Sequence, residues 1–331
     1  MFHASDEMLG SSRCDKGEGL SKRFDISVLG ELNCDLILYG LPAILEPERE
    51  HLANGFSLTL GSSSAIFAHN ISILGSRVGF TSCIGADALG NFCMERLAES
   101  GVDVSGVKRL SDKSTGVTVI LPLAKDRHIL TYPGTMFELD YGLLDFEYLQ
   151  SASHFHLSSF FLLRRLRPRL PEVFLQMRRA GLTTSFDTND DPEDLWSGDV
   201  NSVLKNVDVF LPNEREARKI TGKSDLNTAV DELAPLVPVV VIKRGAQGAI
   251  ARRGKESFEA PAYSVECVDS VGAGDSFNAG FLHKFVGGAD LQTCLEYGNL
   301  AAALSTTRAG GTEAFRDKTH RQNFLLPHLK S

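Results

Sequence analysis

The feature that most constrains the fold of this chain is a regular alternation between short apolar runs and segments with helical periodicity. The runs are rich in β-branched residues and almost continuously apolar, which is typical of strands buried on both faces of a sheet. We therefore predict a three-layer α/β fold, in which helices cover both faces of a mostly parallel central sheet. The predicted strands are 25–32, 77–85, 153–159, 182–188, 207–212 and 237–245, and the predicted helices are 65–74, 91–101, 171–181 and 213–222.

One region departs from this alternation. The stretch "TGVTVILPLAKDRHILTYPG", residues 115–134, contains two strand-like runs joined by a charged turn with no helix between them. We expect it to form a β-hairpin. Together with the irregular segment 36–59, this hairpin would build a small β lid on the α/β core, formed by about 36–59 and 107–133. The core and its lid would make one domain over residues 24–322.

The composition excludes several classes of protein. Residues 1–23 are polar, rich in Gly and Ser, and lack the apolar run of a signal peptide, so we expect a disordered N-terminal tail, with a second tail at 323–331. The formal charge of −8 argues against nucleic-acid or membrane-surface binding. The six cysteines are widely spaced, which favours reduced thiols and a cytoplasmic location. No run approaches the ~18 apolar residues that span a membrane.

The most informative short stretch is "VDSVGAGDSFNAGF", residues 268–281, where Gly272, Ala273 and Gly274 precede Asp275 at the start of a helical pattern. Glycine costs backbone entropy there, which indicates that something approaches the backbone closely. Backbone N–H groups at a helix N-terminus can bind an anion, and a carboxylate beside them could accept a proton from a group that attacks a phosphate. Asp275 could instead cap the helix, although a cap does not require these glycines.

Polar residues also follow several predicted strands, where ligands gather in open parallel sheets. They are Asn33 and Asp35, Asp187 and Asn189, Asn213 and Glu216, and Lys243. Two of these sets have structural alternatives, since Asn213 and Glu216 could form a helix capping box and Lys243 could be a solvated strand end. We interpret His154 and His156 as packing residues, because they alternate on a strand without acidic neighbours.

Taken together, these segments resemble the ribokinase-like sugar kinases, the PfkB carbohydrate kinase family, from about Phe24 to Thr312. The resemblance implies the ribokinase-like fold, a lid that often doubles as a homodimer contact, and an ATP-dependent kinase that uses Mg²⁺ and, in several members, K⁺. The motifs that carry it are "GELNCD" (30–35), "LGSSSAIFAHNISILG" (60–75), "IGADALGNFCMERLAESGVDVSGV" (84–107), "FLPNEREA" (210–217) and, most specifically, "VDSVGAGDSFNAGF".

The resemblance also implies a role for each matching residue. Asp275 would be the general base on the acceptor hydroxyl, and the amides of Gly272, Ala273 and Gly274 would form the anion hole for the transferring phosphoryl group. The acceptor would contact Asn33, Asp35, Gly61, Ser62 and Asp187, and the nucleotide would contact Asn213, Glu216, Lys243, Gly245, Gly248 and Asn299. Glu216 would hold Mg²⁺ through water, and Asp269 with the carbonyl of Val271 would line a monovalent-cation site.

Three positions depart from the pattern of the family. Ser62 and Ile66 stand where many members have glycine and asparagine, which removes an expected hydrogen bond to the sugar, and Val271 replaces a common threonine. The leading expectation is the phosphorylation of a primary hydroxyl on a small sugar or sugar acid, nearest to fructokinase and 2-keto-3-deoxygluconate kinase. The alternatives are a nucleoside kinase, a catalytically weak sugar-sensing member, and an NAD-dependent oxidoreductase, whose early glycine fingerprint is missing.

Overall fold

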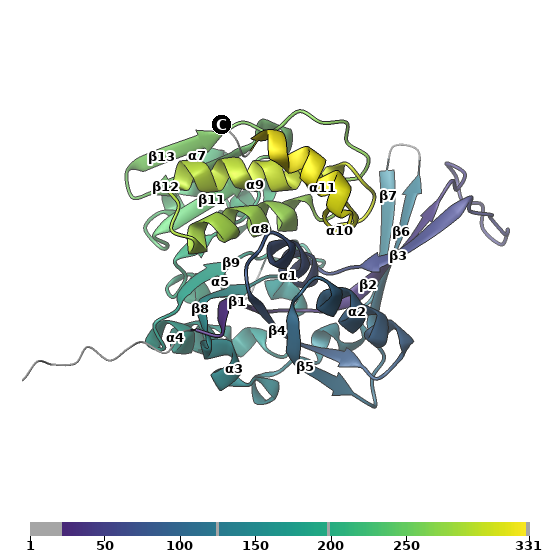
Figure 1. The fold of residues 1–331 in the computed structure, drawn as a ribbon, viewed down its shortest axis with the longest axis horizontal. Coiled ribbons are helices and arrows are strands. Elements are labelled where there is room, and N and C mark those ends of the chain that lie inside the picture. The colour runs from purple at the N-terminus through teal and green to yellow at the C-terminus, as the bar shows by residue number, and fades with distance from the viewer. Residues whose placement is uncertain (1–21, 124–125, 197–198, 329–331) are drawn as a thin grey trace, which may run out of the picture.

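The computed structural model describes residues 22–123, 126–196 and 199–328 (Figure 1). Its largest element is a nine-stranded sheet with the order β13-β12-β11-β10-β9-β8-β1-β4-β5, in which only the pairs β11–β12 and β12–β13 are antiparallel. The predicted mostly parallel sheet is confirmed, whereas most of the predicted tail 1–23 lies outside the described residues. The strands are β1 (Phe24–Leu29), β4 (Val78–Gly85), β5 (Asp103–Leu110), β8 (Ala152–Leu157), β9 (Thr183–Phe186), β10 (Val209–Phe210), β11 (Val239–Lys243), β12 (Ala249–Arg253) and β13 (Glu256–Ala260).

Helices cover both faces of this sheet, as predicted, and each face has its own hydrophobic core. Successive residues of a strand point to opposite cores, so Val241 packs with Phe281 on one side while Val240 packs with Phe174 on the other. One face carries α1 (Ser63–Ile73), α2 (Ala88–Glu99), α8 (Ala273–Val286) and α9 (Leu291–Thr306), with α10 (Glu313–Arg316) and α11 (Lys318–Leu325) beyond them. The other carries α3 (Phe146–Gln150), α4 (Leu170–Arg179), α5 (Val200–Leu204), α6 (Glu214–Thr221) and α7 (Leu226–Leu233).

A second sheet projects from this body as the lid (Figure 1). It has four strands in the order β3-β2-β6-β7, namely β2 (Asn33–Tyr39), β3 (Gly55–Leu60), β6 (Gly116–Leu123) and β7 (Asp126–Tyr132). Two expectations need correction. Asn33 and Asp35, which we expected to follow the first strand, lie inside a further strand, β2, and residues 107–110 belong to the main sheet, because β5 continues its parallel pairing with β4 as far as Leu110.

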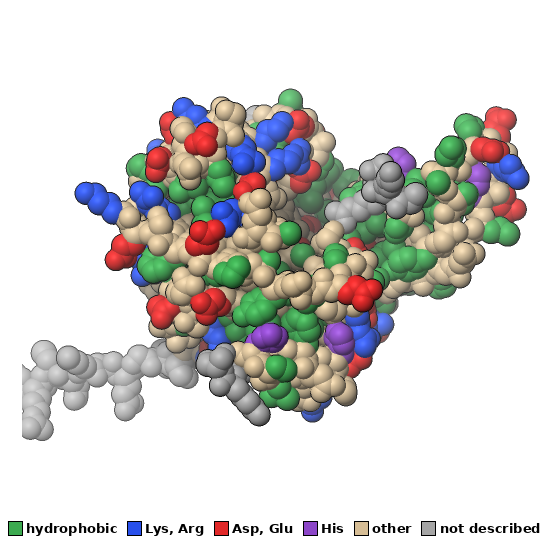
Figure 2. Space-filling model, turned by 90° about the horizontal axis from the view of Figure 1, so that it is seen from above, with side chains coloured by type: hydrophobic (Ala, Val, Ile, Leu, Met, Phe, Trp, Pro, Cys, Tyr) green, Lys and Arg blue, Asp and Glu red, His purple; other side chains and the backbone are tan. Residues whose placement is uncertain are grey.

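The two faces of the lid differ in chemistry. One face, which we call the inner face, carries a row of register partners across all four strands: Thr59, Asp35, Thr118 and Thr131. The opposite face, which we call the outer face, is apolar and carries Leu36, Phe56, Leu58, Val119 and Leu130. Viewed from above, the lid is an arm with hydrophobic side chains along it (Figure 2). The inner face therefore supplies polar groups to the body, whereas on the outer face Leu58 packs against the core of the body and Phe56 and Leu130 are exposed.

The two histidines of β8 lie in the core, as we predicted. His154 and His156 are both fully buried, and the Ser185 hydroxyl lies 2.7 Å from a ring nitrogen of each. Burial lowers the pKa of His154 to about 3, so both rings are packed as neutral groups. Within the described ranges, none of the helices combines the length and apolar character that crossing a bilayer would require.

Candidate active site

Helix α8 begins at the glycine-rich stretch that the sequence singles out. Gly272 is the N-cap residue and has φ 72°, a left-handed conformation that side chains rarely adopt. A Cβ at this position would lie 2.7 Å from Cα of Gly311, so the close approach of two backbones also requires glycine. In the described part of the chain, only the Ala273 amide of the three predicted anion-hole donors has a backbone acceptor, the carbonyl of Ser270 at 3.3 Å. The amide of Gly274 is open to solvent and to a ligand.

Asp275 is the third residue of α8 and is 8% exposed. It is not the helix cap, because that position belongs to Gly272 and no side chain caps the helix. Burial, together with the negative charge of Asp187, raises the pKa of Asp275 to about 7, against the opposing effect of Lys243. A buried carboxylate that titrates near neutral pH is suited to accept a proton from a hydroxyl.

Lys243, at the end of β11, places its ammonium group beside the predicted anion hole. Its Nζ lies 2.5 Å from Oδ2 of Asp187, and a Cβ built on Gly274 would lie 3.7 Å from the same nitrogen. Although burial opposes its charge, the carboxylates of Asp187, Glu216 and Asp275 raise the pKa of Lys243. The side chain is therefore a buried cation at the end of the sheet and not the solvated strand end that we weighed as the alternative.

Asp187 follows β9, and hydrogen bonds from its surroundings occupy both of its carboxylate oxygens. Its Oδ2 accepts from Lys243 and from Nδ2 of Asn278, each at 2.5 Å, and its Oδ1 accepts from the amide of Asn189 at 3.1 Å. Asp187 has no exposed surface. Asp187, which we predicted to contact the acceptor substrate, therefore influences the site mainly through its hydrogen bonds with Lys243 and Asn278.

Asn213 and Glu216 form the capping box that we weighed as their structural alternative. The Asn213 amide donates to Glu216 Oε2 at 2.7 Å, its side chain donates to Oε1 at 2.6 Å, and the amide of Glu216 donates back to Asn213 Oδ1 at 2.9 Å. Burial and the charge of Asp187 raise the pKa of Glu216 to about 8. Across the residues that the structure describes, no group of three or more His, Cys, Asp or Glu side chains is arranged to hold a metal ion.

A pocket of about 330 Å³ lies beside the start of α8. It brings together four of the six predicted nucleotide contacts and part of the predicted anion hole, whereas Asn213 and Glu216 are not among its lining residues. Its walls include the apolar side chains of Tyr263, Val265, Phe277 and Ala302. The predicted residues that line it are Lys243, Gly245, Gly248, Ala273, Gly274 and Asn299. A concave, largely apolar pocket with a cation and open amides at one end fits a nucleotide with its phosphates.

Two of these residues shape the pocket wall. Gly248 has φ 84°, and a Cβ there would lie 2.1 Å from the carbonyl oxygen of Ala260. The Asn299 side chain donates from Nδ2 to the carbonyls of Ala260 and Pro261, at 2.9 and 3.1 Å. Both residues therefore hold the segment after β13 in place, so that Ala262 and its neighbours face the pocket.

Asn33, Asp35 and Gly61 meet at the junction between the lid and the body. A Cβ on Gly61 would lie 2.2 Å from Oδ1 of Asp35 and 3.1 Å from Oδ1 of Asn33, so only glycine leaves room for both side chains. Asn33 donates to Thr118 at 3.0 Å, and its buried Oδ1 has no hydrogen-bond partner in the described structure. Burial, with the charge of Asp275 next, raises the pKa of Asp35 to about 7. These groups are arranged to bind hydroxyl groups of a small molecule.

Two of the three departures from the family pattern, Ser62 and Ile66, have physical counterparts in the structure. Ser62 has φ 66° and caps α1, since its hydroxyl accepts from the amide of Ala65 at 3.2 Å and donates to the carbonyl of Glu31 at 2.7 Å. Ile66 fills the space between the backbones of Gly272 and Gly311. A Cβ built on Gly272 would lie 3.1 Å from the Ile66 side chain, and one built on Gly311 would lie 2.6 Å from it. The replacement of an amide by Ile66 therefore makes this wall of the site apolar.

Asp269 connects two loops beside the anion hole. Its Oδ1 accepts from the amide of Val271 at 3.0 Å, and its Oδ2 accepts from the amide of Gly310 at 2.9 Å. Both carboxylate oxygens thus hold backbone, and the carbonyl groups of these loops are left as the groups that could face a monovalent cation.

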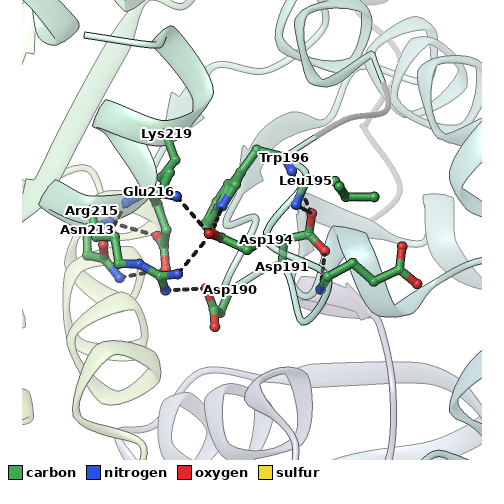
Figure 3. A network of polar contacts seen from close by, with 10 residues as sticks. Asp190, Asp191, Asp194, Leu195, Trp196, Asn213, Arg215, Glu216 and Lys219 are labelled. Atoms are coloured by element: carbon green, nitrogen blue, oxygen red, sulfur yellow. Dashed lines mark hydrogen bonds and ion pairs between the residues drawn. The ribbon is translucent and has the colours of Figure 1, made fainter. Parts of the chain in front are cut away.

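The loop after β9 is held against α6 by a network of charges (Figure 3). Arg215 pairs with Asp190 at 2.5 Å and with Asp194 at 3.2 Å, and Lys219 also pairs with Asp194. The Asp191 carboxylate accepts from three backbone amides further along the loop, those of residues 193, 195 and 196. These contacts fix the loop that follows Asp187 against α6.

Sequence reasoning missed three buried residues of the site. Glu31 accepts three hydrogen bonds, Asn278 donates to Asp187, and Asn70 donates to the Ser276 hydroxyl at 2.9 Å and to the carbonyl of Gly311 at 3.0 Å. Asn278 and Asn70 are polar residues inside otherwise apolar helical patterns, and that signal could have identified them. Glu31 had the weaker signal of an acid directly after a buried strand.

The chain is similar to known kinases in sequence and in fold. The chain is 26% identical to a ribokinase of Haemophilus influenzae, over 92% of this chain and 99% of that one, and 29% identical to a 2-dehydro-3-deoxygluconokinase of Bacillus subtilis, over 83% and 89%. The structure of a protein described as ribokinase II from E. coli, in complex with ATP and Mg²⁺, matches with a TM-score of 0.82 at 27% identity, over 93% of this chain and 100% of that one. Since residues 23–318 also match the family itself, the chain belongs to the pfkB family of carbohydrate kinases.

Proposed function

We propose that this protein transfers the γ-phosphoryl group of ATP to a primary hydroxyl of a small sugar or sugar acid. Asp275 would accept the proton of that hydroxyl as the new bond forms, and the amides at the start of α8 would stabilise the charge on the phosphoryl group. Little covalent chemistry is needed for such a transfer, which depends on in-line positioning and on neutralised charge.

The position of Asp275 is the observation that carries this proposal. Ala273 and Gly274, directly before it, line the pocket that suits a nucleotide. On its other side Asp275 lies close enough to Asp35 to raise the pKa of that residue, next to Asn33 and Gly61. One carboxylate therefore lies between a phosphate-binding backbone and a cluster suited to hydroxyl groups.

The surroundings of Glu216 are compatible with bound Mg²⁺, and those of Asp269 with bound K⁺. Bound Mg²⁺ would neutralise phosphate charge, and because Asn213 already engages both oxygens of Glu216, a contact through water suits this residue. Asp269 would shape a K⁺ site through the loops that it joins, with the carbonyl of Val271 as a ligand. Stimulation of the reaction by KCl over choline chloride would support the K⁺ site, and equal rates would exclude it.

A second, smaller pocket favours acids among the acceptors. It has a volume of about 130 Å³, and it lies where the inner face of the lid meets the body. Thr131, one of its lining residues, lies 3.2 Å from Thr118, which accepts a hydrogen bond from Asn33. Arg164 in this pocket pairs with Glu193, whereas Arg167 has no ion-pair partner among the described residues. A carboxylate on the acceptor would supply one.

The test of the function is a measurement of ADP release over a panel of sugars, sugar acids and nucleosides with MgATP. We expect turnover with a sugar or sugar acid, and Asp275→Asn should lower kcat by on the order of a hundredfold or more while ATP binding persists. Asp290→Asn, which changes the exposed N-cap of the next helix, is the matched control. Undiminished turnover in Asp275→Asn would refute the general base, and activity restricted to nucleosides would refute the acceptor class.

The proposed preference for acceptors that carry a carboxylate can be tested separately. Arg167→Gln should raise KM for a carboxylated acceptor about tenfold and leave KM for a neutral sugar unchanged, because only the acid loses an ionic contact. Arg164→Gln removes a charge that is already paired and is the control. Equal effects on acidic and neutral acceptors would contradict this part of the proposal.

We also propose that the protein forms a homodimer through the outer face of the lid. Phe56 and Leu130 on this face are 72% and 59% exposed. A single-layer sheet with one apolar side requires a covering partner, and a second copy presents the same apolar surface.

A further inference from the structure

Glu31, directly after β1, is a buried carboxylate that the proposed chemistry does not use. Its side chain accepts hydrogen bonds from the Ser63 amide at 3.0 Å, the Ser64 hydroxyl at 2.7 Å and the Ser159 hydroxyl at 2.6 Å. Glu31 itself is 2% exposed. The preceding Gly30 makes room for this arrangement, since a Cβ there would overlap the hydroxyl of Ser64.

Three residues near the site have strained backbone conformations, and their hydrogen bonds lead to Glu31. Ser62, Ser159 and Asn189 have φ values of 66°, 62° and 53°, in the left-handed region that non-glycine residues rarely adopt. Ser62 donates to the Glu31 carbonyl, Ser159 donates to its carboxylate, and Asn189 donates to the Ser159 hydroxyl at 2.9 Å. Strain of this kind persists only where the surroundings over-determine it, and it concentrates at functional sites.

The segments held in this way carry the acceptor side of the site. Residues 61–64 include Gly61, which fits against Asn33 and Asp35, and Asn189 donates its amide to Asp187. Ser63 connects Glu31 to the proposed base, because its amide bonds to Glu31 and its hydroxyl stabilises the ionised form of Asp275. Glu31 is thus linked to both the acceptor cluster and the base.

We propose that Glu31 is a positioning residue of the phosphoryl transfer, whose carboxylate fixes the acceptor-binding loop 61–64 and lies near Asp275. The inference rests on the proposed function. The groups that act on Asp275 from the surrounding elements are Asp187 after β9, Lys243 on β11, Glu31 after β1 and, from the lid, Asp35. Of the three carboxylates among them, Glu31 alone is held by donors from both α1 and the end of β8.

Two variants separate the charge of Glu31 from its hydrogen bonds. Glu31→Gln keeps the shape, and its oxygen can still accept from Ser63 and Ser159 while its NH₂ group donates to Ser64, so mainly the charge is lost. Ser64→Ala removes one hydrogen bond and retains the charge. In Glu31→Gln we expect the acid limb of the kcat/KM profile to move down by roughly half to one pH unit, because a neighbouring negative charge no longer opposes ionisation of the base.

In Ser64→Ala we expect a several-fold rise in the acceptor KM with the acid limb unmoved. An unmoved acid limb in Glu31→Gln together with an unchanged acceptor KM in both variants would overturn the proposal. A carboxyl ¹³C titration of Asp275, assigned with Asp275→Asn, gives a readout that needs no turnover. If the wild-type protein phosphorylates no acceptor, the proposed function fails, and the Asp275 pKa in Glu31→Gln still decides whether the charge of Glu31 acts on the base.

Discussion

The two sheets of this protein differ in how their apolar faces are covered. In the nine-stranded sheet, both faces are covered by helices, and aromatic side chains such as Phe155, Phe174 and Phe186 have no exposed surface. The four-stranded lid carries a row of polar residues on its inner face, and its outer face leaves Phe56 and Leu130 exposed while Leu58 packs against the core of the body. The main sheet is therefore stabilised by its own core, whereas the lid depends on its neighbours.

The same difference divides the candidate site. The nucleotide side is built on the main sheet and its helices, with backbone amides and Lys243 as the main polar groups. The acceptor side takes Asn33 and Asp35 from β2 of the lid. In the proposed function, the main sheet and its helices would thus hold the nucleotide, and the lid would contribute the groups that select the acceptor. Four predictions test this division, in order of expected effect.

The largest effect is expected from a matched pair of phenylalanines. Phe186→Ala should destabilise the protein by about 3–5 kcal/mol, because it opens a cavity among packed aromatic rings. Phe56→Ala, on the outer face of the lid, should cost less than about 0.5 kcal/mol in the monomer. Urea unfolding at low protein concentration measures both, and similar costs would contradict the contrast between the sheets.

A second pair tests the junction of the lid and the body. In Gly61→Ala the new methyl group would displace Asp35, so kcat/KM for the acceptor should fall on the order of 10- to 100-fold, with ATP affinity preserved. Gly55→Ala, at the start of strand β3, which Gly61 directly follows, adds a methyl group that meets nothing within 4 Å and is the control. An equal loss of ATP affinity in Gly61→Ala would show that the two sides of the site are not separable.

The open face of the lid predicts a change of oligomeric state. Leu130→Asp places a charge in the proposed dimer contact and should convert dimers to monomers in light scattering after gel filtration, with a several-fold rise in the acceptor KM. Ile129→Asp, the neighbouring residue, points to the other side of the strand and should leave the mass unchanged. A monomeric wild-type protein would remove the dimer from the proposal.

The smallest effect concerns stability against pH. The pKa of Asp275 is raised to about 7 from an ordinary value of 3.8, so wild-type stability should fall as the pH rises through this window and the carboxylate must ionise while buried. Asp275→Asn should therefore be more stable than wild type at pH 8, and the difference should vanish near pH 4. Asp290→Asn should show no such gain, because hydrogen bonds from Thr293 lower the pKa of Asp290. Equal urea midpoints at pH 8 would contradict the burial of an ionised base.

Local patterns predicted much of the fold. The apolar runs became the parallel strands, because a strand buried on both faces must be apolar throughout. The glycines before Asp275 correctly marked the start of α8, since a left-handed φ and a close approach of backbones are local demands. The irregular segment 36–59 was not recognised as two strands, because their pairing with each other and with β6 depends on residues distant in the sequence.

By itself the sequence determined the alternation of strands and helices and the chemistry available at the start of α8, because periodicity and glycine act over a few residues. Only the tertiary structure decided which polar groups meet. It paired Lys243 with Asp187, and it brought Ser62, Ser159 and Asn189, which have strained backbone conformations, together around Glu31. The physical reason is that a buried charge needs partners, and the fold, through contacts between residues far apart in the chain, selects them.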